Sequence, residues 1–113
     1  TEVEFRIIGM RTGVSDKNDC AWYQPVFDVP DDPMVMEFND FFWELDREHL
    51  TDKQFARALS DFQKFAQCIE LDYSRPFSWS DDLVNMTGWA ILGVKKDDTY
   101  GEGNTLKKYI TKK

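Results

Sequence analysis

The chain has 113 residues, 15% of them aromatic, and a formal net charge of −7 at pH 7. This length predicts a single domain spanning residues 1–113. The acidic balance argues against a nucleic acid or an anionic membrane as the direct partner, because binding to a phosphate backbone depends on Lys and Arg, and it favours a basic protein.

Two strands are predicted at the start of the chain. Residues 2–7 alternate polar and apolar side chains, which is typical of a strand with one buried face. Residues 12–19 are rich in Gly, Ser, Asp and Asn and predict a loop. Residues 20–29 predict a second strand. Because Pro25 removes an amide donor within it, we expect an edge position or a bulge there.

A first helix is predicted from about residue 33 to residue 48. Asp32 can cap it, and Pro33 suits the first helical position. Six side chains then recur at helical spacing and predict its buried face: Met34, Phe38, Phe41, Phe42, Leu45 and His49.

A second helix is predicted from Thr51 to about Glu70, and it has the strongest signals in the chain. Thr51 suits the N-cap, and Gln54 stands three residues later, as a capping box requires. One apolar stripe follows at helical spacing, comprising Phe55, Ala58, Leu59, Phe62, Phe65, Ala66 and Ile69.

The C-terminal part predicts more sheet. Residues 71–86 are irregular, with a single helical turn possible after Ser80. Residues 88–96 predict a central strand and residues 97–104 a hairpin loop. Residues 105–111 fit a strand slightly better than a helix. The predicted fold is therefore α+β, an antiparallel sheet with two helices packed on one face in the order ββααββ.

The sequence offers no catalytic set, so we predict neither an enzyme nor a cofactor. His49 is the only histidine, and we expect it on the apolar face of the first helix. Cys20 and Cys68 are expected to be buried free thiols, without zinc-ligand spacing around them. No metal site is predicted. The longest apolar run is too short to cross a membrane and no signal peptide is recognised, so a soluble, cytoplasmic protein is expected.

The candidate partner-binding surface lies in the acidic segment 28–48, which holds eight acidic residues and one basic residue. On a helical wheel with ~100° per residue, Trp43 lies about 150° from the centre of the apolar stripe. An exposed tryptophan among charged side chains is typical of a protein-binding hot spot, whereas the plain alternative is a solvated face. The predicted binding residues are Met36, Glu37, Asp40, Trp43, Glu44, Asp46 and Arg47.

These features predict a small acidic inhibitor that binds a basic protein. The most concrete version is a toxin-neutralising immunity protein or a phage-type antagonist that blocks a basic active site or a nucleic-acid groove. The alternative is a small-ligand-binding or enzymatic domain with a pocket near residues 75–89. A third reading is nucleic-acid binding through the C-terminal lysines. The oligomeric state is left open. The pocket near residues 75–89, on which the alternative function depends, is expected to be lined by Arg75, Trp79, Asn85 and Trp89.

Overall fold

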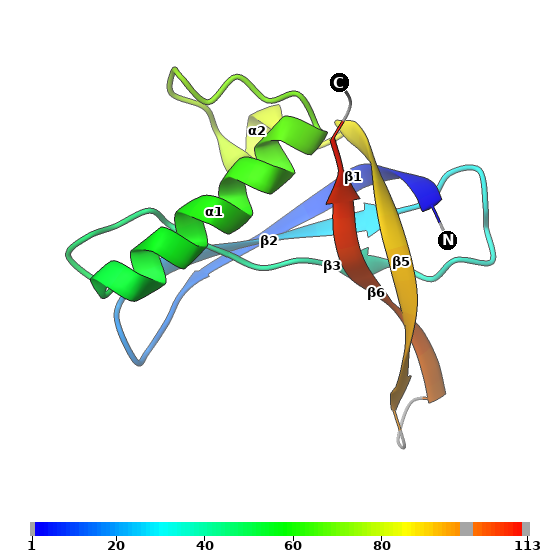
Figure 1. Cartoon of the computed structure of the whole chain (residues 1–113), viewed down its shortest axis with the longest axis horizontal. Helices are drawn as coiled ribbons and strands as arrows, with labels where there is room; N and C mark the ends of the chain where they lie inside the picture. Colours follow the sequence, from blue (N-terminus) through cyan, green and yellow to red (C-terminus); the bar gives the residue numbers. More distant parts are fainter. Residues whose placement is uncertain (1, 98–100, 112–113) are drawn as a thin grey trace.

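The computed structural model describes residues 2–97 and 101–111 (Figure 1). The protein is an α+β domain in which an antiparallel sheet curls around an aromatic core and one long helix packs against it. Among the described residues, no helix is long and apolar enough to span a membrane. The elements are β1 (Glu2–Val14), β2 (Ala21–Asp28), β3 (Phe38–Asn39), β4 (Phe42–Trp43), α1 (Asp52–Cys68), α2 (Trp79–Asp82), β5 (Thr87–Asp97) and β6 (Gly101–Ile110).

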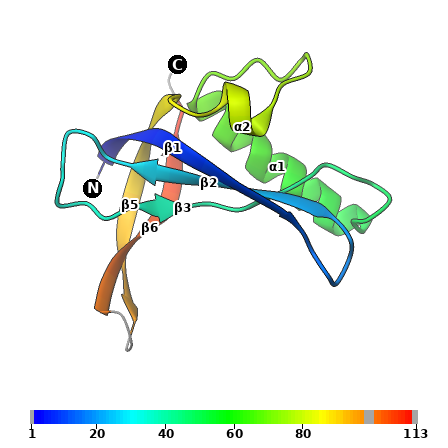
Figure 2. The same cartoon turned by 180° about the vertical axis from the view of Figure 1, so that it is seen from behind.

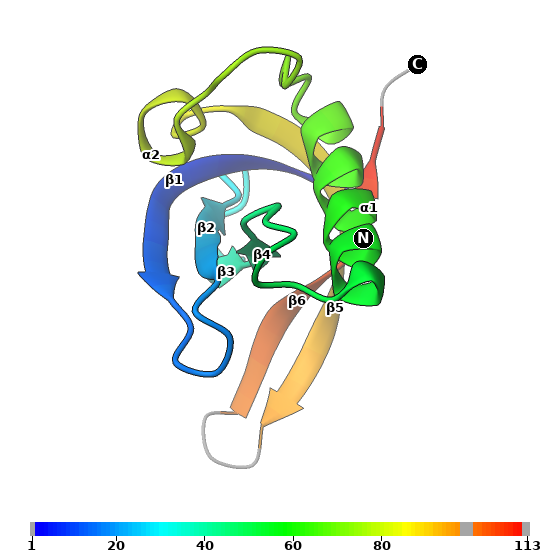
Figure 3. The ribbon, with the colours of Figure 1, turned by 90° about the vertical axis from the view of Figure 1, so that its left-hand side faces the viewer.

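The sheet is a partly open barrel. Its strand order is β3-β2-β1-β5-β6, with β4 also paired to β2, and every pairing is antiparallel. The long strand β1 pairs with β2 on one side and with β5 on the other, and Figure 2 shows it running beside β2. The two ends of this order approach each other, because β3 contacts β6 and the Tyr109 hydroxyl donates to Asp40 Oδ2 at 2.6 Å. Helix α1 contacts both β4 and β6 beside this seam (Figure 3).

The two N-terminal strands confirm their prediction, and β1 extends further than the alternation indicated. The register between β1 and β2 shifts between Ile7 and Gly9, which lets the strand continue to Val14. Pro25 lies in β2, a strand paired on both sides, so it is not at an edge. Its carbonyl accepts from the Asp40 amide at 3.3 Å, so its missing donor faces the interruption between β3 and β4.

Helix α1 confirms the predicted capping box. The Thr51 side chain accepts from the Gln54 amide, and the Gln54 side chain accepts from the Thr51 amide. Phe62 and Phe65 are buried in the core, while Phe55 and Leu59 at the N-terminal end of the stripe are only half-buried. The helix therefore buries its C-terminal half most deeply.

The helix predicted over residues 33–48 is wrong. This segment instead forms turns and the two short strands β3 and β4, which pair with β2. Phe38 and Phe42 are both buried, as predicted, but they enter the core from extended chain opposite Phe27 and Tyr23. The order ββααββ and the packing of two helices on one face are therefore not confirmed. The physical reason is that spacing of four residues fits both a helical and an alternating period.

The C-terminal half is close to its prediction. Strands β5 and β6 form a hairpin, so residues 105–110 are a strand rather than a helix. The predicted loop 97–104 falls partly outside the described residues. The predicted helical turn exists as α2, but Ser78 caps it instead of Ser80. Cys20 and Cys68 are buried free thiols, as expected.

Candidate functional site

The structure separates the residues that the helical wheel placed together. Trp43 pairs with Trp22, whereas Phe38 pairs with Phe27, five residues further along β2. At about 3.4 Å per residue, these two positions are about 17 Å apart, and Met36 lies beyond Phe38. Trp43 and Met36 therefore do not form one surface in the way the wheel indicated, because the helix on which they would be neighbours does not exist.

Most charged members of the predicted surface have intramolecular partners. Asp40 accepts from the Tyr109 hydroxyl at 2.6 Å and from the Phe41 amide at 2.7 Å. Glu44 is engaged with Tyr23. Partial burial, and second a hydrogen bond with Glu44, raise the pKa of the Tyr23 hydroxyl to about 12. The Arg47 guanidinium carbon lies 4.0 Å from the centroid of the Phe55 ring. Glu37 is exposed.

Three aromatic side chains gather on the outer side of the barrel, and we call them the aromatic face: Trp22, Phe41 and Trp43. The Trp22 and Phe41 rings stack with centroids 5.6 Å apart, and the Phe41 and Trp43 rings meet edge to face at 4.9 Å. Residues directly opposite each other point to the same side of a sheet. Phe42 opposite Tyr23 is buried in the core, so Trp43 opposite Trp22 points outward.

Two of the three rings of the aromatic face pack against neighbouring residues of the fold. Trp22 lies directly over Gly13, where an added Cβ atom would fall 2.4 Å from the indole ring, so any larger residue at position 13 would displace that ring. Trp43 is half-buried and packs against the small cluster that contains Cys20 and Leu50. Phe41 is 42% exposed, which leaves its ring open to a ligand.

Polar side chains lie next to the aromatic face on the same outer side of the sheet. The Gln24 side-chain amide donates to Asn39 Oδ1 at 3.2 Å, and Arg11 stands opposite Gln24 in β1. Gln24 lies two residues beyond Trp22, so it points to the same side of β2. Stacking surfaces and hydrogen-bonding groups therefore occur next to each other.

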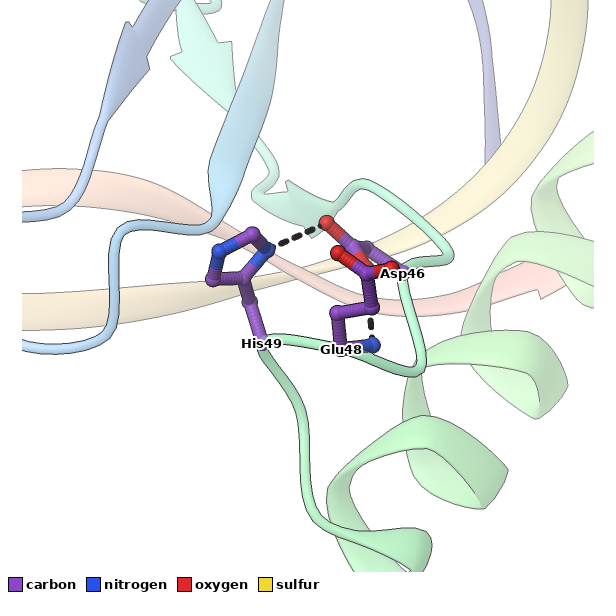
Figure 4. Close-up of side chains that lie close together, drawn as sticks. All are labelled: Asp46, Glu48 and His49. Atoms are coloured by element: carbon purple, nitrogen blue, oxygen red, sulfur yellow. Dashed lines mark hydrogen bonds and ion pairs between the residues drawn. The ribbon is translucent and has the colours of Figure 1, made fainter.

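A separate cluster contains Asp46, Glu48 and His49 (Figure 4). Asp46 Oδ1 accepts from the Glu48 amide at 2.8 Å, and Asp46 Oδ2 lies 2.5 Å from His49 Nδ1. Both carboxylate oxygens are thus engaged in closing a turn. The prediction that His49 lies on a buried helix face is wrong, because its side chain is 38% exposed and residues 46–49 form a turn instead.

His49 is expected to titrate above the ordinary histidine value. The hydrogen bond with Asp46 raises the pKa of His49 above 6.5, and the same bond lowers the pKa of Asp46 below 3.8. The pair therefore stabilises the fold between these two shifted values; its contribution is lost as pH rises through the His49 pKa or falls through the Asp46 pKa. NMR titration of the His49 ring measures this directly. Asp46→Asn should return the midpoint toward 6.5, and equal midpoints in both proteins would contradict the pairing.

The four residues of the alternative pocket do not share a hollow. Arg75 and Trp79 line one hollow together with Tyr23. Asn85 and Trp89 line another together with Cys68. The four residues are thus divided between two separate hollows.

Comparison of the chain with protein-family models, with curated proteins and with solved structures finds no match. The assignment of the aromatic face as the candidate site consequently rests on the geometry of the structure. Sequence reasoning missed Trp22 and assigned Phe41 to a buried stripe. The signal for Trp22 was the alternation of β2, in which Tyr23, Pro25 and Phe27 occupy the other side.

Proposed function

We propose that the protein is a non-catalytic binding protein that holds single-stranded nucleic acid on its aromatic face. The observation that carries this proposal is the stacked, outward-facing pair formed by Trp22 of β2 and Phe41, which lies between β3 and β4. Unpaired bases stack on exposed aromatic rings whatever their sequence, because every base has a π face. The neighbouring amides of Gln24 and Asn39 can donate to and accept from base edges.

The topology supports the same ligand class. A five-stranded, partly open Greek-key barrel, with its helix between the third and fourth strands, is the arrangement of OB-type barrels. In those barrels the face of the second and third strands and the adjoining loops bind oligonucleotides or oligosaccharides. If β3 and β4 are counted as one interrupted third strand, the aromatic face of this chain lies at the position of the binding face in OB-type barrels. Because topology alone does not specify function, the support comes from this coincidence of position and side-chain chemistry.

The net charge of −7 limits the expected affinity without opposing the stacking itself. Two stacked bases contribute ~2–6 kcal/mol, whereas a micromolar complex needs about 8 kcal/mol. Contacts with phosphates must therefore add to the aromatic face. We expect binding that is weak for this ligand class and falls with salt.

A second candidate is the acidic inhibitor of a basic protein. The observation that favours it is the excess of acidic residues in segment 28–48. Trp43 and Phe41 would then be the apolar centre of an interface, with exposed acids such as Glu37 at its rim. Fast association that slows with salt would be its signature.

Fluorescence anisotropy with a labelled oligothymidylate tests the primary proposal. The expected result is binding at least about tenfold tighter than to a duplex of the same length, since one accessible base stack contributes ~1–3 kcal/mol. Quenching of tryptophan fluorescence should accompany it. Equal affinity for both, or no binding to the single strand, would contradict the proposal. Capture of a basic protein by a chain that ignores the oligonucleotide would favour the second candidate.

A further inference from the structure

Arg11 lies on the same outer side of the sheet as the aromatic face. It stands opposite Gln24 of β2, and residues directly opposite each other point to the same side of a sheet. Arg11 also precedes Gly13 by two residues, a spacing that keeps both positions on one side, and an added Cβ atom at Gly13 would meet the Trp22 ring. Met10, the residue before Arg11, packs against the core, as this alternation requires. Arg11 therefore projects from the side on which Trp22 lies.

The strand register aligns Arg11 with the aromatic face. Trp43 pairs with Trp22, so continuing this register by two residues places Phe41 opposite Gln24. Two adjacent rows then cross the strands, one made of Arg11, Gln24 and Phe41 and the other of Gly13, Trp22 and Trp43. Neighbouring strands lie ~4.8 Å apart, so the backbone of Arg11 is about 10 Å from that of Phe41. The arginine side chain can extend over part of this distance, and a sugar-phosphate unit can bridge the rest.

The Arg11 guanidinium is available to a ligand. Arg11 is exposed, and within residues 2–97 and 101–111 its guanidinium takes part in no ion pair or hydrogen bond. An exposed guanidinium presents a planar set of donors that matches the geometry of a phosphate. The row that contains Arg11 thus joins a cation to a stacking ring.

Carboxylates flank these two rows but do not belong to them. Asp28 lies at the end of β2, and its Oδ2 accepts from the Arg6 guanidinium at 3.0 Å. Asp16 lies in the loop that follows β1, and Glu37 lies just before β3. Arg11 is therefore the charged residue in register with the aromatic face, although the chain as a whole has a net charge of −7.

The Gln24 side chain occupies the position between Arg11 and Phe41. Its amide donates to Asn39 Oδ1 at 3.2 Å, which leaves the Gln24 carbonyl oxygen and the Asn39 amino group for a ligand. A nucleotide that crosses this row would meet a ring, an amide pair and a guanidinium in that order. This order matches the base, the sugar and the phosphate of one nucleotide.

We propose that Arg11 binds the phosphate of a nucleotide whose base stacks on the aromatic face. This inference rests on the proposed function, and it supplies one of the phosphate contacts that stacking alone leaves missing. The ligand class is a single-stranded oligonucleotide, contacted by Arg11 through its backbone. Because phosphate contacts carry no sequence information, the contribution of Arg11 is independent of the base.

Salt-dependent binding of labelled oligothymidylate and oligoadenylate to Arg11→Gln tests the contact. Loss of one phosphate contact should reduce the slope of log affinity against log salt by about 0.7. Affinity at low salt should fall at least about threefold, by the same factor for both oligonucleotides. Arg11→Lys retains the charge and should therefore keep the slope of the unmodified chain. A slope in Arg11→Lys as low as that in Arg11→Gln would contradict a charge contact.

The matched control is Arg75→Gln, which reaches the same net charge. Arg75 is exposed and lines a hollow with Tyr23, on the other side of β2 from Trp22, so its replacement should leave the slope nearly unchanged. Equal reductions of the slope in both variants would overturn the inference and assign the effect to net charge.

Two further outcomes separate this inference from the proposed function. An unchanged slope in Arg11→Gln, or a loss of affinity for only one of the two oligonucleotides, would overturn the phosphate contact; the proposed function would stand if Trp22→Ala still weakened binding. Absence of binding by the unmodified chain would overturn both.

Discussion

Phe65→Ala is expected to destabilise the protein by about 3–5 kcal/mol, the usual cost of truncating a buried phenylalanine. Phe65 is fully buried, and its ring lies 4.7 Å from that of Phe42 and 5.4 Å from that of Tyr109. It therefore joins α1 to both sides of the barrel seam. Because domains of this size are stable by only about 5–15 kcal/mol, the loss is a large fraction of the total. Urea unfolding followed by circular dichroism measures it.

Leu59→Ala on the same helix is the matched control. Leu59 is only half-buried, so its truncation removes less apolar area and leaves a smaller cavity. The expected cost is less than half of that at Phe65. Equal costs at the two positions, or a loss below about 1 kcal/mol at Phe65, would contradict the assignment of Phe65 to the centre of the core.

Trp22→Ala and Phe41→Ala are each expected to weaken oligothymidylate binding by about 10- to 100-fold. Each removes one stacking surface, worth ~1–3 kcal/mol per base, and about 1.4 kcal/mol is a factor of ten. Trp43→Ala is a less informative change, because Trp43 also packs against the cluster of Cys20 and Leu50 and its loss would affect stability. Fluorescence anisotropy at constant salt gives the affinities.

Tyr73→Ala provides the control for these aromatic substitutions. Tyr73 is 40% exposed, close to the 42% of Phe41, but it lies in the segment between α1 and α2. Its replacement should change the affinity less than twofold, on the order of the effect of a substitution outside the interface. A loss as large as that of Phe41→Ala would show that exposed aromatics contribute without regard to position, against a defined aromatic face.

The long helix could be predicted because its signals are local. The capping box at Thr51 and Gln54 and the stripe ending in Phe65 and Ile69 lie within one continuous segment. Strands β1, β2 and β5 were recognisable for the same reason, since alternation and short apolar runs are read from neighbouring residues. Such local agreement between pattern and structure needs no knowledge of the rest of the fold.

Segment 33–48 could not be assigned in this way. Phe38 and Phe42 are four residues apart, a spacing that satisfies one helical face and also two inward positions of an extended chain. Pairing with β2 decides between them, and the same segment also bonds through Asp40 to Tyr109, 69 residues away. Tertiary contacts therefore override the local pattern here.

The candidate site was missed for a related reason. Phe41 was assigned to a buried stripe that requires a helix, and Trp22 was one of several apolar residues in a predicted strand without a known partner. Their stacking appears only when β2 and β4 are paired. Net charge was also a poor guide, because a sum of −7 does not say that Arg11 stands in register with the aromatic face.

The affinity of the Trp22→Ala/Phe41→Ala double variant for oligothymidylate, compared with that of the unmodified chain at the same salt, tests the central claim most directly. The account predicts that the unmodified chain binds and that the double variant loses at least about 100-fold in affinity, from two stacking contacts of ~1–3 kcal/mol each, with an unchanged circular dichroism spectrum. Equal affinity of the two proteins, or no binding by the unmodified chain, would contradict it.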